Sequence, residues 1–193
     1  MSIESAITFF IAIVIFSITP GPGIFAILAK SLTQGAKACL ALSIGMVISD
    51  IVYLILACYG LATIAEHWGG AFTAIRILGA LYLFYLGYKL WTAPMIIPNS
   101  PAALNSKSQW LKDFIQGFFI SASNPKVILF YIAFLPTFID LSVLHIPDIM
   151  LITVLTFIGL MLGLVSISIA AAAASKFFES QRALKNLNRS AGS

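Results

Sequence analysis

Five long apolar stretches follow one another along this chain, and they constrain its fold more than any other feature. They cover residues 5–29, 36–65, 71–91, 114–139 and 147–175. Each is long enough to cross the hydrocarbon layer of a bilayer, which takes about 20 helical residues. Only 9% of the residues are charged, whereas soluble domains average about 25%. We therefore predict an all-α membrane protein, a polytopic helical bundle, because lipid offers backbone groups no hydrogen-bond partners.

The polar segments divide the chain into two halves. Residues 92–112 hold three prolines and several polar side chains, which indicates a cytoplasmic loop between the halves. The first half, residues 1–91, contains three predicted spans. The second half, residues 113–175, contains two, and residues 176–193 form a basic tail. Inverted repeats would pair three spans with three, so a sixth span is expected and not found. Three interpretations stay open: a fragment, a truncated gene product, or a protein completed by a partner.

The basic residues lie mainly on one side of the predicted membrane. Connections on the other side carry Glu66, Asp140 and Asp148 and no Lys or Arg. Lys and Arg mark the cytoplasmic side of a membrane protein, so we predict an external N-terminus and a cytoplasmic tail. The basic residues on the predicted cytoplasmic side are Lys30, Lys37, Lys89, Lys107, Lys112, Lys176, Arg182, Lys185 and Arg189.

Two of the apolar stretches are interrupted by proline, in equivalent places. Proline removes a backbone donor and clashes with the preceding helical turn. Unwound backbone inside a bilayer survives only where protein or a water-filled cavity supports it, and it can then bind ions or substrate. We predict that the two breaks approach each other and form a substrate path, although a packing kink is the alternative. The residues of the breaks are Thr19, Pro20, Gly21 and Pro22, and then Asn124, Pro125 and Lys126.

Two charged residues stand within apolar sequence. Asp50 lies near the middle of the second stretch and Lys126 near the middle of the fourth. A charge at that depth costs at least ~3 kcal/mol on insertion scales, so it usually marks a pathway or a pair. We predict that Asp50 carries protons and that Lys126 attracts a carboxylate. A purely structural ion pair between the two is the alternative.

The sequence offers no catalytic or metal-binding constellation. Cys39 and Cys58 are far apart, and CxxC, HExxH and Ser–His–Asp arrangements are absent from the apolar stretches. Because the basic residues are spread between apolar runs, they do not form a nucleic-acid surface. We predict a protein that is not an enzyme, needs no cofactor or metal and binds no nucleic acid.

Several motifs resemble those of the LysE/RhtB family of amino-acid exporters. They are Thr19-Pro20-Gly21-Pro22, Gly79-Ala80-Leu81-Tyr82-Leu83 leading to Leu86-Gly87, Gly117-Phe118, Asn124-Pro125-Lys126 and Phe134-Leu135-Pro136. They occur in the family's order over nearly the whole chain, and Asp50 matches an acidic position often seen in the family's second helix. The resemblance implies a bacterial inner-membrane exporter of amino acids or their derivatives, driven by the proton gradient.

Two positions depart from the family pattern. Gly23 follows the first motif where members commonly have Asn, and members generally end with a sixth apolar helix. The expected partners are an amino-acid-like solute, protons and the lipid bilayer, and an assembly of identical chains is left open. The competing hypotheses are a non-transporting or incomplete membrane subunit and a membrane-embedded enzyme.

Overall fold

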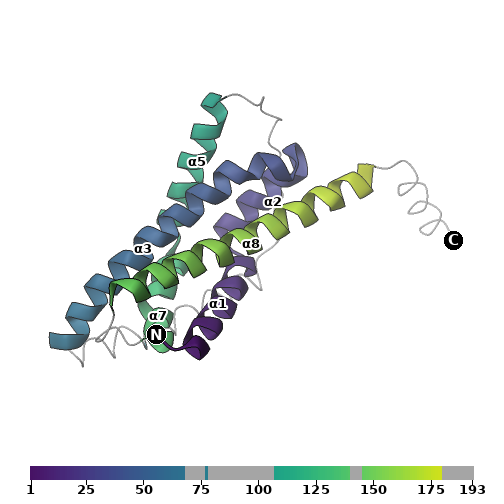
Figure 1. The fold of residues 1–193 in the computed structure, drawn as a ribbon. Coiled ribbons are helices and arrows are strands. Elements are labelled where there is room, and N and C mark those ends of the chain that lie inside the picture. The colour runs from purple at the N-terminus through teal and green to yellow at the C-terminus, as the bar shows by residue number, and fades with distance from the viewer. Residues whose placement is uncertain (68–76, 78–106, 140–144, 180–193) are drawn as a thin grey trace.

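The computed structural model describes residues 1–67, 77, 107–139 and 145–179, and these residues form helices without a β-strand (Figure 1). Two unbroken helices are long and apolar enough to cross a membrane, and two bent helix pairs each qualify as a further span. This confirms the predicted all-α membrane protein. The four spans correspond to four of the five predicted stretches. The predicted span 71–91, most of the loop 92–112 and most of the tail 176–193 lie outside the described residues.

The two bent spans are the proline-interrupted stretches. In the first, α1 (Ile3–Ile18) meets α2 (Pro22–Gln34) at 59°. In the second, α5 (Lys107–Ala122) is followed at 55° by a composite helix. The parts of that composite are α6 (Pro125–Leu129), the π-helical turn η2 (Phe130–Phe134) and α7 (Leu135–Phe138).

The two unbroken spans are α3 and α8. A 3₁₀ turn, η1 (Ala36–Cys39), leads directly into α3 (Leu40–His67). α8 (Ile146–Glu179) has 34 residues. At 1.5 Å per residue it is roughly 50 Å long, more than the ~30 Å hydrocarbon layer, so part of it must lie outside that layer.

The helices of the two halves pair with each other across the molecule. α3 from the first half packs mainly on α5 from the second, while α1 and α2 pack mainly on α8 (Figure 1). Both pairings bring glycines to the contact. A Cβ at Gly45 would collide with the Phe114 carbonyl, and one at Gly117 with the Leu42 carbonyl. Gly159 similarly faces Ile13. Small residues at membrane helix contacts let backbones approach closely.

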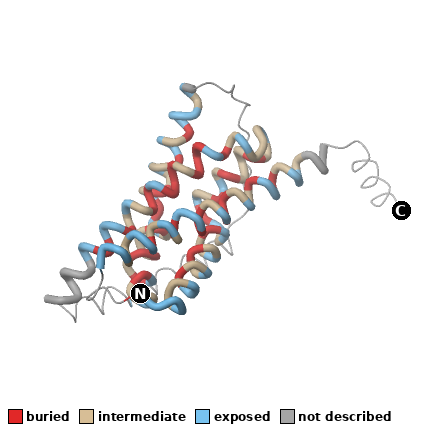
Figure 2. The backbone as a smooth tube through the Cα atoms, viewed as in Figure 1, coloured by how far each residue is buried: buried red, intermediate tan, exposed pale blue. Residues whose placement is uncertain are grey.

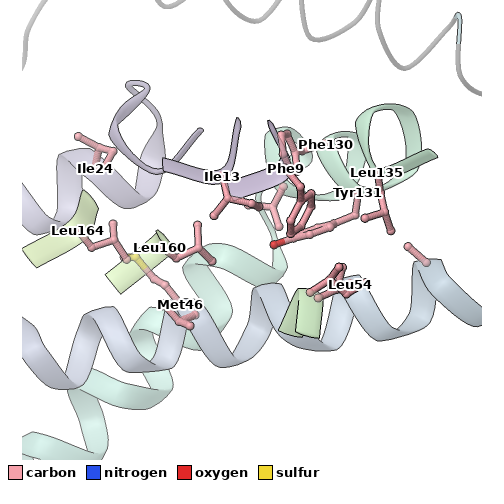
Figure 3. Close-up of a cluster of buried hydrophobic side chains, with 14 of the residues drawn as sticks. Phe9, Ile13, Ile24, Met46, Leu54, Phe130, Tyr131, Leu135, Leu160 and Leu164 are labelled. Atoms are coloured by element: carbon pink, nitrogen blue, oxygen red, sulfur yellow. The ribbon is translucent and has the colours of Figure 1, made fainter. Parts of the chain in front are cut away.

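Buried residues lie on the sides of the helices that face one another, and exposed residues lie on the outer sides (Figure 2). Phe9 and Ile13 of α1, Leu54 of α3 and Tyr131 and Leu135 of the second bent span meet in one cluster (Figure 3). The exposed apolar residues include Ile7, Ile11, Ile15, Val52, Leu56, Leu111, Phe119, Val154, Phe157 and Leu162. A soluble protein rarely exposes so many large apolar side chains, so this outer surface fits contact with lipid.

A buried ion pair joins α2 to α5. The Lys30 ammonium lies 2.9 Å from an Asp113 carboxylate oxygen, and the two side chains are 11% and 7% exposed. The same carboxylate accepts a hydrogen bond from Gln109. α5 therefore begins at Lys107, inside the loop predicted over 92–112, because its first polar turns have partners in the protein.

Candidate functional site

The first helix break ends α1 and starts α2 within three residues. The Thr19 amide still bonds back to α1, donating to the Ile15 carbonyl at 3.1 Å. Thr19 itself is extended, as expected for a residue before proline. Gly21 is also extended and precedes Pro22, the first residue of α2, where the absence of an N–H costs nothing. No side chain caps the start of α2.

The second break has a different construction. Asn124 is extended, and its side-chain oxygen accepts a hydrogen bond of 3.1 Å from the Lys126 backbone amide. Asn124 is therefore an N-cap for α6, and Pro125 takes the first helical position. Unlike the first break, this one is organised by a side chain.

Lys126 joins the two breaks. Its ammonium donates to the Phe16 carbonyl at 2.9 Å and to the Thr19 carbonyl at 2.8 Å. The same nitrogen lies 4.3 Å from the centre of the Phe16 ring. The last carbonyls of a helix lack partners within it and carry partial negative charge, so a cation is stabilised there. The predicted approach of the two breaks is confirmed by these contacts.

Asp50 lies on α3, is 4% exposed and accepts a hydrogen bond from the Ser121 hydroxyl of α5. Lys126 is close enough to Asp50 for an electrostatic interaction. Within the described part of the chain, however, the ion pairs within 4.0 Å do not include these two residues. The alternative of a structural Asp50–Lys126 pair is therefore not what this conformation shows: each group has another partner.

A small cavity lies between the breaks and Asp50. It offers about 40 Å³ to the centres of water molecules, whereas one water needs roughly 10–15 Å³. The cavity can therefore hold a few waters in this conformation, and an amino acid would require it to open. Its lining comes from both halves and consists of Phe16, Ser17, Gly21, Gly23, Ile24, Met46, Asp50, Ser121, Asn124, Lys126, Val127, Leu160 and Leu164.

The predicted site residues divide into three groups by position. Gly21, Asp50, Asn124 and Lys126 line the cavity. Thr19 contributes its backbone carbonyl, which accepts a hydrogen bond from the Lys126 ammonium. The prolines at 20, 22 and 125 are exposed, so their contribution is the bend of the backbone.

Comparison with known proteins agrees with this geometry. The family model described as LysE type translocator matches residues 14–193. The chain belongs to the LysE type translocator family. No solved structure gives a significant match to it.

Curated relatives of this chain include proteins named for leucine efflux. The leucine efflux protein of Salmonella typhimurium is 32% identical over 138 residues, which cover 72% of this chain and 65% of the relative. That of Klebsiella pneumoniae is 33% identical over 138 residues, covering 70% of this chain and 64% of the relative. The matched part thus spans slightly under two thirds of these relatives' length.

One departure from the LysE family pattern has a structural counterpart. A Cβ on Gly23 would lie 3.2 Å from the Met46 sulfur, a tight contact. In Figure 3 the Met46 side chain lies beside Leu160 and Leu164, which also line the cavity. Where Asn is common in the family, this chain leaves space that the flexible Met46 thioether fills.

Sequence reasoning missed the cavity residues that are not charged and not part of a proline motif. Ser121 is the clearest case, because it is the hydrogen-bond partner of Asp50. The only feature of the sequence that points to Ser121 is its position shortly before the second break. Tyr53 was missed as well; its hydroxyl donates to the Ala122 carbonyl at 2.6 Å and so ties α3 to the end of α5.

Proposed function

We propose that this chain exports a small amino acid, with leucine as the first candidate, across the bacterial inner membrane in exchange for protons. The observation that carries the proposal is the meeting of two broken helices at one cavity lined by Asp50 and Lys126. Broken helices that face each other are a recurrent binding arrangement in secondary transporters. The family membership and the names of the relatives support the choice of solute.

The two charged residues take different roles in this proposal. Lys126 supplies positive charge for the solute carboxylate, since its side chain lines the cavity. Asp50 carries the proton. It is the acidic group that lines the cavity, and its hydrogen bond to Ser121 leaves it free of a cationic partner within ion-pair distance, as far as the chain is described. A carboxyl without such a partner can change its charge without breaking an ion pair.

Transport requires the cavity to open alternately to each side. The glycine contacts of α3 with α5 involve backbone carbonyls, which makes these two helices one unit. α1 and α2 form the other unit with α8. We propose that the two units move against each other, so that the moving bodies are not the two halves of the sequence.

The orientation proposed from the basic residues is an external N-terminus and a cytoplasmic tail. It is supported by the Lys30–Asp113 pair, which places the end of α2 beside the start of α5. Lys37 lies in η1, just before α3, and Lys112 belongs to the same end of α5. The test is a reporter enzyme that works only outside the cytoplasm, fused after Ser193. Activity of this reporter would contradict the proposed orientation.

The proposal is tested by changing Asp50 to Asn. The variant keeps the shape of the side chain and removes its titration, so efflux of radiolabelled leucine from liposomes driven by a pH gradient should be lost. Leucine–leucine exchange, which moves no net protons, should continue. Normal gradient-driven efflux in Asp50→Asn would refute the proton-carrier role.

Asp113→Asn is the matched control. Asp113 is as buried as Asp50 but lies outside the cavity and binds Lys30. This variant should be less stable, and each folded molecule should retain proton-coupled efflux. Wild-type chain that moves leucine in neither assay would refute leucine export itself.

A further inference from the structure

An ammonium group already occupies a specific position in the cavity, and it belongs to the protein. Among the described residues, the Lys126 nitrogen contacts three groups: the carbonyl oxygens of Phe16 and Thr19 at 2.9 and 2.8 Å, and the Phe16 ring at 4.3 Å from its centre. A lysine ammonium has three N–H donors and no acceptor. The three neighbours thus form a complete site for a primary ammonium.

This site is built from two backbone carbonyls and one aromatic ring of the first break. The Thr19 carbonyl lies in the break itself, just beyond α1, and the Phe16 carbonyl in the last turn of α1 also accepts a hydrogen bond of 3.3 Å from the Thr19 amide. The Phe16 ring is held in place by the Phe130 ring, with centroids 4.2 Å apart. Lys126 reaches the site from the opposite half of the chain, across Gly21.

The α-ammonium of an amino acid presents the same three donors as the Lys126 ammonium. We propose that the Phe16 and Thr19 carbonyls and the Phe16 ring form the subsite for the ammonium of the solute, and that Lys126 occupies this subsite when no solute is bound. This inference rests on the proposed function and adds where each end of the solute binds. Arrival of the solute displaces Lys126, whose ammonium then binds the solute carboxylate or approaches Asp50.

The consequence is that Lys126 competes with the solute ammonium in the empty protein. The free-energy cost of displacing Lys126 is offset when the solute also carries a carboxylate, because the Lys126 ammonium gains that group as its new partner. A solute with an ammonium alone offers no such compensation. Wild-type protein should therefore discriminate strongly against simple amines.

The test uses 3-methylbutylamine, which is leucine without its carboxylate, and the full chain in lipid nanodiscs. Calorimetric titration should show weak or undetectable binding to wild type and at least about tenfold tighter binding to Lys126→Met. Methionine has a similar length and no charge, so it vacates the subsite. Lys126→Arg is the matched control: it retains a cation and should keep the amine out.

Two further measurements separate the subsite from a simple gain of space. The carboxylate 4-methylpentanoate has the same alkyl chain, and its binding should not improve in Lys126→Met. Adding Phe16→Leu to Lys126→Met should weaken amine binding by roughly two- to fivefold, since the cation–π contact contributes about 0.5–1 kcal/mol. Thermal unfolding of each variant verifies that it is folded.

Equal amine binding by wild type and Lys126→Met, or weaker binding by a folded Lys126→Met, would overturn the inference. So would an equal gain for 4-methylpentanoate. These outcomes are distinct from failure of the proposed function. Absence of leucine transport by wild type, together with the amine gain in Lys126→Met, would refute leucine export and leave the ammonium subsite standing.

Discussion

The two helix breaks have nearly the same bend, 59° and 55°, but they are built from different parts. At the first break the start of α2 has no side-chain cap, and the Phe16 and Thr19 carbonyls at the end of α1 accept hydrogen bonds from Lys126. At the second, Asn124 caps α6 and Lys126 extends away to the first break. The first break accepts hydrogen bonds through its backbone carbonyls, and the second break donates them through the Lys126 side chain.

This difference teaches that proline and side chains have separate tasks here. Pro22 and Pro125 both stand at the first position of a helix, and both are exposed. They account for the similar bends. The chemistry depends on what is placed beside each proline, so substitutions at the second break should have larger effects than substitutions at the first.

Lys126→Met should have the largest effect. The two hydrogen bonds between the breaks are lost, and such bonds between membrane helices contribute on average ~0.6 kcal/mol each, up to ~1.7. We expect the free energy of unfolding to fall by about 1–3 kcal/mol and gradient-driven leucine efflux to disappear. Unfolding by SDS in mixed micelles measures the first and liposome assays the second. Unchanged stability would mean that the contact between the breaks contributes nothing to the fold.

Asn124→Ala should have an intermediate effect. The helix α6 loses its N-cap, which typically costs ~1 kcal/mol. The corresponding control at the first break is Thr19→Val. The Thr19 hydroxyl bonds only back to the Ile15 carbonyl of its own helix among the contacts described, so its removal should change stability by less than about 0.5 kcal/mol. Equal losses for the two variants, measured by the same unfolding assay, would remove the distinction between a side-chain break and a backbone break.

Gly21→Ala should have the smallest effect. Gly21 has an extended backbone that any residue can adopt, and a Cβ would lie 3.6 Å from the Lys126 side chain, an ordinary contact. We expect stability within about 0.5 kcal/mol of wild type. Gly45→Ala is the contrasting glycine variant, because its Cβ would overlap the Phe114 carbonyl and overpacking costs about 1–3 kcal/mol. A larger loss for Gly21→Ala than for Gly45→Ala would contradict this assignment of tight and loose positions.

The sequence predicted the four spans that the structure describes, both breaks, and the placement of Asp50 and Lys126 within those spans, because apolar length and proline act locally. It could not predict the partners of those charged groups. Ser121 reaches Asp50 only through the packing of α3 on α5, and the acceptors of Lys126 are backbone atoms about 110 residues away. Lys30 was interpreted as a loop charge that marks orientation. Its burial against Asp113 depends on two helices from different halves, which no local pattern records.

The reciprocal pairing of helices also bears on how this chain is made. During synthesis the first half is inserted before the second, since N-terminal parts fold first. Yet the face of α3 around Gly45 packs on α5, and α1 packs on α8, so both contacts need helices of the second half. The early helices therefore remain in the bilayer without these neighbours until the second half is inserted. Insertion of α8, rather than completion of the first half, is the event that supplies α1 and α2 with their main neighbour.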